Sequence, residues 1–87
     1  MLQSIKEYYP EEEFMTADGF DDAIIGFDEL CSPIRIIYSV KKCIEILVSR
    51  DGMTNEEATE YFYFNCLRAY MGEGTPIWCI DNLSYEE

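Results

Sequence analysis

The hydrophobic residues of the chain follow two kinds of spacing, and the shorter apolar runs predict strands. Residues 34–38 (Ile-Arg-Ile-Ile-Tyr) are mostly β-branched or aromatic and begin just after Pro33, which is typical of a strand. Residues 23–28 and 75–80 are also short apolar runs, and they predict the first and the last strand of the chain. Gly26 lies inside the first run, where a glycine favours a bulge or a close contact.

Two longer segments have the spacing of helices. In residues 40–50 the apolar positions recur at intervals of three and four, so one face should be buried, and Ser39 is placed to cap this helix. The second segment starts with a capping box, in which the Thr54 hydroxyl and the Glu57 carboxylate each accept the other residue's backbone amide. It should end at Gly72, a typical C-terminal cap. Because this helix is apolar on nearly every side, we expect it to be covered on more than one side.

Asn65 is the polar exception among the aromatic residues of the second helix. An amide that is buried without a partner costs about 1–3 kcal/mol. We therefore expect the Asn65 side chain to be at least half buried and to bond the backbone of residues 72–75 or the start of the last strand. A ligand-binding role at the helix–strand junction, shared with Trp78, is the weaker alternative.

The elements follow one another as strand, strand, helix, helix, strand. This order predicts an α+β fold in which two helices pack on a small antiparallel sheet of about three strands. Residues 2–9 add a short N-terminal helix that ends at Pro10. The 87 residues form a single domain, with an acidic N-terminal segment at residues 1–16 and a frayed tail at residues 82–87.

The charge of the chain limits the classes of partner that it can bind. Hydrophobic residues make up 48% of the sequence, which is enough for a core, but 18 acids face 6 bases and the net charge is −12. We expect no direct contact with nucleic acid or with an anionic membrane, because both need clustered Lys and Arg. The acids are concentrated near the start, since residues 1–30 hold nine acids and one base, Lys6.

Residue types that carry catalysis and metal binding are sparse. The chain has no histidine, and its four cysteines, at positions 31, 43, 66 and 79, lack the Cys-x-x-Cys spacing of zinc and redox sites. The acids of residues 18–22 do not follow the ligand pattern of a calcium-binding loop, and the glycines of residues 72–76 follow a helix end, where phosphate is disfavoured. We predict no enzyme activity, no metal and no cofactor, with the thiols reduced in a cytosol.

The acidic N-terminal third is the main candidate for a binding surface. Its carboxylates can imitate the phosphates of DNA and attract a basic groove, and nearby tyrosines can serve as interface anchors. The predicted partner-binding residues are Glu11, Glu12, Glu13, Asp18, Asp21, Asp22, Tyr8 and Tyr9. The simpler interpretation is that the charge keeps a small protein soluble.

Four segments together resemble a family of short, uncharacterised proteins common in bacteriophage and prophage sequences. They are residues 17–26 (ADGFDDAIIG), 37–47 (IYSVKKCIEIL), 51–65 (DGMTNEEATEYFYFN) and 69–78 (AYMGEGTPIW). The resemblance covers most of the chain. It implies a phage origin and a place in the host bacterial cytoplasm, and it implies no activity and no site residue.

The resulting hypothesis is a phage accessory protein that binds and inhibits a host bacterial protein. An anti-CRISPR or other anti-defence inhibitor is the type considered, with a nuclease or CRISPR effector as its target. The alternative is a non-enzymatic structural or interaction module, or a homo-oligomer, in which the acidity serves only solubility. Salt distinguishes the two, because screening weakens a contact between charges and leaves an apolar contact intact.

Overall fold

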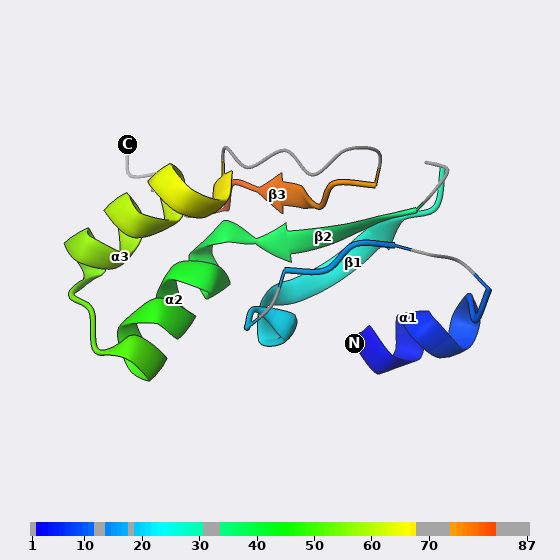
Figure 1. The fold of residues 1–87 in the computed structure, drawn as a ribbon, viewed down its shortest axis with the longest axis horizontal. Coiled ribbons are helices and arrows are strands. Elements are labelled where there is room, and N and C mark those ends of the chain that lie inside the picture. Colours follow the sequence, from blue (N-terminus) through cyan, green and yellow to red (C-terminus); the bar gives the residue numbers. More distant parts are fainter. Residues whose placement is uncertain (1, 12–13, 18, 31–33, 68–73, 82–87) are drawn as a thin grey trace, which may run out of the picture.

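The computed structural model describes residues 2–11, 14–17, 19–30, 34–67 and 74–81. These residues contain the helices α1 (Leu2–Tyr8), α2 (Val40–Asp51) and α3 (Asn55–Phe62) and the strands β1 (Ile24–Asp28), β2 (Arg35–Ser39) and β3 (Ile77–Cys79) (Figure 1). The predicted α+β class is confirmed, as is the order strand, strand, helix, helix, strand after an N-terminal helix.

The sheet is mixed, which corrects the predicted antiparallel arrangement. Its order is β1-β2-β3, with β1 antiparallel to β2 and β3 parallel to β2, in the register Ile37 to Ile77. The cause is the connection between the last two strands. Both α2 and α3 lie between β2 and β3, and a connection of that length allows the chain to return in the same direction.

The bulge that Gly26 suggested is present in β1. Ile24 pairs with Tyr38 and Gly26 pairs with Ile37, so that Ile25 is an extra residue on this strand. A Cβ added to Gly26 would meet none of the described atoms within 4 Å. The bulge therefore leaves open space on the sheet beside Ile37.

The caps of the two long helices form as the sequence predicts. The Ser39 side chain accepts the Lys42 amide at 3.1 Å, so α2 starts directly where β2 ends. Gly52 follows α2 with a φ of 71°, the left-handed conformation that glycine adopts readily. Both bonds of the capping box between Thr54 and Glu57 are made at the start of α3. The predicted C-terminal cap, Gly72, lies outside the described residues, as does the tail 82–87.

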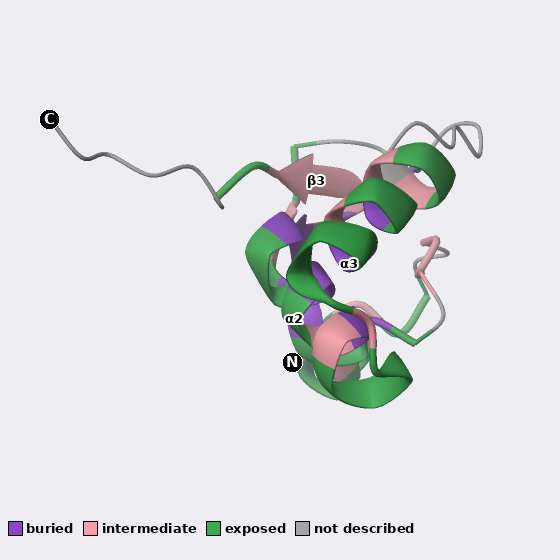
Figure 2. Ribbon diagram, turned by 90° about the vertical axis from the view of Figure 1, so that its left-hand side faces the viewer, coloured by how far each residue is buried: buried purple, intermediate pink, exposed green. Residues whose placement is uncertain are grey.

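The core lies where the helix pair meets the sheet. Figure 2 shows that the buried positions of α2 and α3 face inward and that their outer sides are exposed. The Phe62 ring at the end of α3 lies 5.2 Å from Trp78 of β3 and 6.1 Å from Phe20. The core residues with no more than 1% exposure are Ala23, Ile36, Tyr38, Val40, Cys43, Leu47, Ala58 and Phe62.

Asn65 does not have the predicted environment. It lies in a π-helical turn, Tyr63–Leu67, that continues α3, and its side chain is exposed. Its Nδ2 donates to the Tyr61 carbonyl oxygen at 3.0 Å, a bond to its own helix four residues earlier. Since the amide faces solvent and is satisfied locally, it needs no partner in a distant turn. The expectation that the Asn65 side chain is at least half buried is wrong, and the predicted partners at residues 72 and 73 lie outside the described residues.

Candidate protein-binding surface

The residues predicted to bind a partner lie on two separate elements. Glu11 is exposed just after α1, and Asp21 and Asp22 are exposed in a short 3₁₀ turn, Asp21–Ala23, that packs near α2. Figure 1 places this turn at the start of β1 and the carboxyl end of α1 well away from it, at the right-hand side of the view. Glu12, Glu13 and Asp18 lie outside the described residues. The described acids of the N-terminal third thus do not form one compact cluster.

The two predicted tyrosine anchors differ in exposure. Tyr8 is 75% exposed, as an interface anchor would be. Tyr9 is half buried, and its hydroxyl donates to Glu29 at 3.0 Å while its ring contacts Phe27 at 5.4 Å. Tyr9 therefore has a structural role in holding α1 against β1, and Tyr8 is the more accessible of the two.

A different surface, on α3 and its π-helical continuation, combines acids with exposed aromatic rings. Tyr61 is 44% exposed and Phe64 is 83% exposed. The prediction that this helix is covered on more than one side is therefore wrong for these two side chains. The reason is that α2 is the helix found beside α3 within the described part of the chain, and it covers the face that carries Ala58 and Phe62.

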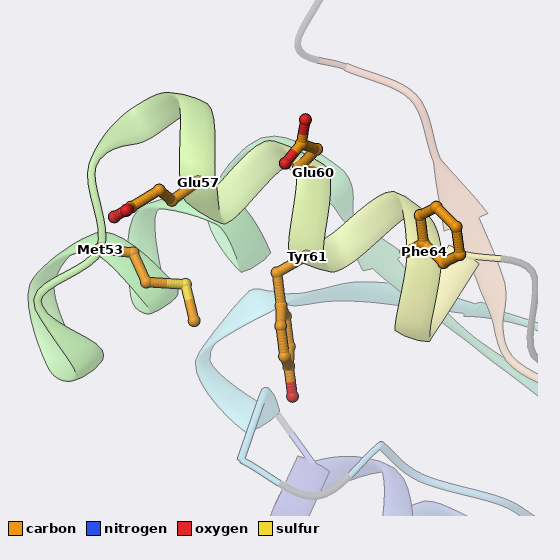
Figure 3. A pocket seen from close by; sticks show the side chains of 5 residues that line it. All are labelled: Met53, Glu57, Glu60, Tyr61 and Phe64. Carbon is orange, nitrogen blue, oxygen red and sulfur yellow. The ribbon is translucent and has the colours of Figure 1, made fainter.

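A shallow, open hollow lies against this surface. It has a volume of about 710 Å³ and is lined by Met53, Glu57, Glu60, Tyr61 and Phe64. Figure 3 shows Met53 and Tyr61 projecting toward the same side of α3, with Phe64 at the far end of the helix and Glu60 standing on the opposite side. The lining therefore has an apolar floor and an acidic edge, and the described residues that form it include no base.

A second hollow flanks the same helix. It has a volume of about 630 Å³ and is lined by Asn55, Glu56, Thr59, Glu60 and Tyr63. Glu60 lines both hollows and stands on the ridge between them. We name this ridge with its two hollows the α3 surface. From the sequence Glu57 was predicted only as part of a capping box, and the aromatic residues of a helix that is apolar on nearly every side were the available signal for this surface.

Arg50, a described base close to Tyr61, is already engaged by other groups. Arg50 forms an ion pair with Asp51 at 3.1 Å, donates to the Gly19 carbonyl oxygen at 2.8 Å and lies 5.7 Å above the Phe20 ring. The hydrogen bond between the two side chains raises the pKa of Arg50 and lowers the pKa of Asp51. Arg50 therefore stays charged, but its side chain contacts Asp51 and the region of the 3₁₀ turn, not the glutamates of α3.

The cysteines of the described residues have the environment of structural thiols. Cys43, Cys66 and Cys79 are free, and Cys31 lies outside the described residues. Burial, with smaller contributions from Cys66 and Asp81, raises the pKa of Cys43 to about 12. Burial also raises the pKa of Cys66. Both thiols are protonated at neutral pH, which makes them poor nucleophiles and poor metal ligands.

The weaker alternative, a ligand site shared by Asn65 and Trp78, receives no support from their positions. Trp78 is half buried and packs against Tyr38 at 5.1 Å, whereas Asn65 lies on the exposed side of the π-helical turn. Neither residue lines a hollow of the α3 surface. Within the described part of the chain, no three Cys, Asp or Glu side chains are grouped so that they could hold a metal ion.

Comparison with known proteins does not assign the chain to a family. The chain matches no protein-family model, no curated protein and no solved structure. None of the described helices has the length and apolar character needed to cross a membrane.

Proposed function

We propose that the protein acts by binding another protein through its carboxylates, and that this partner presents a basic surface. The supporting observation is the state of the acids. Every described Asp and Glu except Asp28 is exposed, and the ion pair found among the described residues is that of Arg50 with Asp51. Most of the net charge of −12 is therefore available to an oppositely charged partner.

The kind of partner follows from the charge and from the sequence resemblance. Basic grooves that normally hold nucleic acid are complementary to a surface of this kind, and the attraction between opposite charges raises the rate of encounter with them. The resemblance to phage proteins points to a target in the host bacterium. The proposed role is therefore inhibition of a host nucleic-acid-binding protein, such as a nuclease or CRISPR effector, in the bacterial cytoplasm.

Affinity capture from a bacterial lysate tests this function. The tagged protein should retain a basic protein that is released between roughly 0.05 and 0.5 M salt, because screening at these concentrations shortens the range of the attraction. A variant with Glu11→Gln, Asp21→Asn and Asp22→Asn should retain less of it. A matched control neutralises the same number of acids elsewhere, with Glu45→Gln, Glu86→Gln and Glu87→Gln. Capture that resists high salt, or equal losses in both variants, would contradict the proposed role.

The structure also gives a specific reason to test self-association. Ile37 and Ile77 are neighbours in the register of the sheet, both are partly exposed, and the space beside Gly26 is open on the same side. An apolar face of this kind can pair with a second copy. Sedimentation at low and high salt decides the question, since a dimer formed by this face should persist at 0.5 M salt, which is about five times the concentration that gives a 10 Å screening length. It should be lost in Ile77→Lys, and a monomer under all conditions would exclude it.

A further inference from the structure

We infer that the α3 surface is the docking element for the partner, and that the hollow between Tyr61 and Phe64 receives an arginine side chain. This inference rests on the proposed function and names the part of the molecule and the partner group involved. It places the anchoring contact on α3, while the acids of the N-terminal third contribute to the long-range attraction.

The lining of the hollow matches the parts of an arginine. Met53 and the exposed aromatic rings offer apolar surface to the aliphatic stem, and a planar guanidinium stacks on aromatic faces. Glu57 and Glu60 supply the opposite charge at the edge. Positions 57, 61 and 64 are four and three residues apart, so these side chains share one side of the helix, and Glu60 stands on the ridge at its edge.

The exposure of Phe64 is the feature that requires an explanation. A phenylalanine that is 83% exposed contributes little to the fold, and large aromatic side chains are the common anchors of protein interfaces. It lies beside Tyr61, which is 44% exposed, so the two rings form one accessible patch rather than two isolated residues. Their acidic surroundings favour a cationic occupant over a purely apolar one.

The helix is held in place before any partner arrives. Its first turn is fixed by the capping box, with bonds of 3.0 and 3.1 Å between Thr54 and Glu57. Ala58 and Phe62 are fully buried against the core. The side chains of the hollow therefore project from a fixed backbone, which lowers the entropy lost when a partner binds.

A second copy of this chain is the less suitable occupant. Two molecules of charge −12 repel each other, and Arg50, the arginine nearest α3 in the described structure, is engaged with Asp51 and Gly19. A partner with clustered arginines can place one side chain in each hollow, on the two sides of the ridge that Glu60 forms. Glu60 should therefore matter more than any other single acid of α3.

Titration with N-acetyl-argininamide, followed by amide chemical shifts in NMR, tests the site without knowledge of the partner. The shifts should be concentrated in residues 57–64, and the neutral isostere N-acetyl-citrullinamide should bind at least about threefold more weakly. Glu60→Gln and Phe64→Ala should each weaken arginine binding roughly two- to fivefold. The matched control is Glu45→Gln, an exposed acid of α2 that lines neither hollow, and it should leave binding unchanged.

Three results would overturn the inference: shifts spread evenly over all exposed acids, equal binding of the citrulline probe, or unchanged binding in both variants. The nearly isosteric Glu60→Gln keeps the test valid even if Phe64→Ala alters the fold. Capture experiments separate this inference from the broader function. If Phe64→Ala and Glu60→Gln retain the captured partner as well as the wild type does, the docking site is wrong and the function stands. If the arginine probe binds α3 but no basic protein is captured, the function is wrong and the site stands.

Discussion

Asp81 joins two parts of the chain that are far apart in the sequence. It follows β3, and its carboxylate accepts the Ser39 hydroxyl at 2.5 Å and the Lys41 amide at 2.9 Å. These bonds bring the end of the last strand to the first turn of α2, where a carboxylate also complements the helix dipole. One exposed side chain thus helps to fix the position of β3 relative to the helix pair.

Replacing Asp81 with Ala should lower the free energy of unfolding by about 1 kcal/mol at pH 7, the usual cost of removing a side chain that accepts a backbone amide in the first turn of a helix. Burial raises the pKa of Asp81, but the hydrogen bonds from Ser39 and Lys41 outweigh it, and the net effect lowers the pKa. A folded-state pKa below the unfolded value means that the carboxylate stabilises the fold above pH ~4 and that this stabilisation is lost as the pH falls through the folded value. Urea unfolding of the two proteins between pH 7 and pH 3 should show the difference shrinking, and a constant difference would contradict this account.

At Asn65 the structure leads to the opposite expectation from the sequence. The side chain is exposed and, among the described residues, donates to the Tyr61 carbonyl oxygen of its own helix. Asn65→Ala should therefore change the free energy of unfolding by no more than about 0.5 kcal/mol, as is usual for surface substitutions. A loss of more than twice this amount in thermal or urea unfolding would show that Asn65 has a buried partner after all.

At the level of elements, the features that depend on neighbouring residues could be predicted from the sequence, and the features that depend on distant segments could not. The caps at Ser39 and Thr54 depend on residues within three positions, and both form as predicted. The parallel pairing of β3 depends on where a distant segment returns to the sheet, which hydrophobic spacing does not encode. The π-helical turn after Phe62 likewise has no simple sequence signal. For this reason the environment predicted for Asn65 was wrong.

Two glycines provide a matched test of what each element requires. Gly52 ends α2 with a φ of 71°, whereas Gly26 is not among the residues with positive φ, and a Cβ at either position would meet none of the described atoms within 4 Å. Gly52→Ala should cost about 1 kcal/mol because alanine disfavours the left-handed conformation. Gly26→Ala should be neutral or slightly stabilising, since alanine reduces the freedom of the unfolded chain.

Urea unfolding of the two glycine variants separates backbone strain from steric contact. A loss at Gly26 equal to that at Gly52 would mean that the space beside β1 is filled, for example by a second copy on the sheet face that carries Ile37. Urea unfolding of Gly26→Ala at several protein concentrations then shows whether a second copy of the chain fills this space, because only association would make the loss of stability depend on concentration.

For the whole molecule, composition predicted the acidic character but not its distribution. The nine acids of residues 1–30 drew attention to the N-terminal third, yet the described members lie on separate elements. The acids of α3 are fewer, but helical geometry places them beside exposed rings on a fixed backbone. Sequence counts cannot show which carboxylates share a surface with Tyr61 and Phe64, because that depends on which face of α3 is covered by α2.

The net charge of −12 should make salt act in opposite directions on the fold and on the complex. In the free protein, exposed acids repel one another with few bases to offset them, so raising salt from about 0.05 to 0.5 M should screen the repulsion and raise the melting temperature. In the complex the same screening removes attraction to the basic partner, so the dissociation constant should increase. Thermal unfolding and binding measured over one salt series check both signs together. A melting temperature that falls with salt would mean that attractive pairs dominate the surface, and the carboxylates would then not be free to bind a partner.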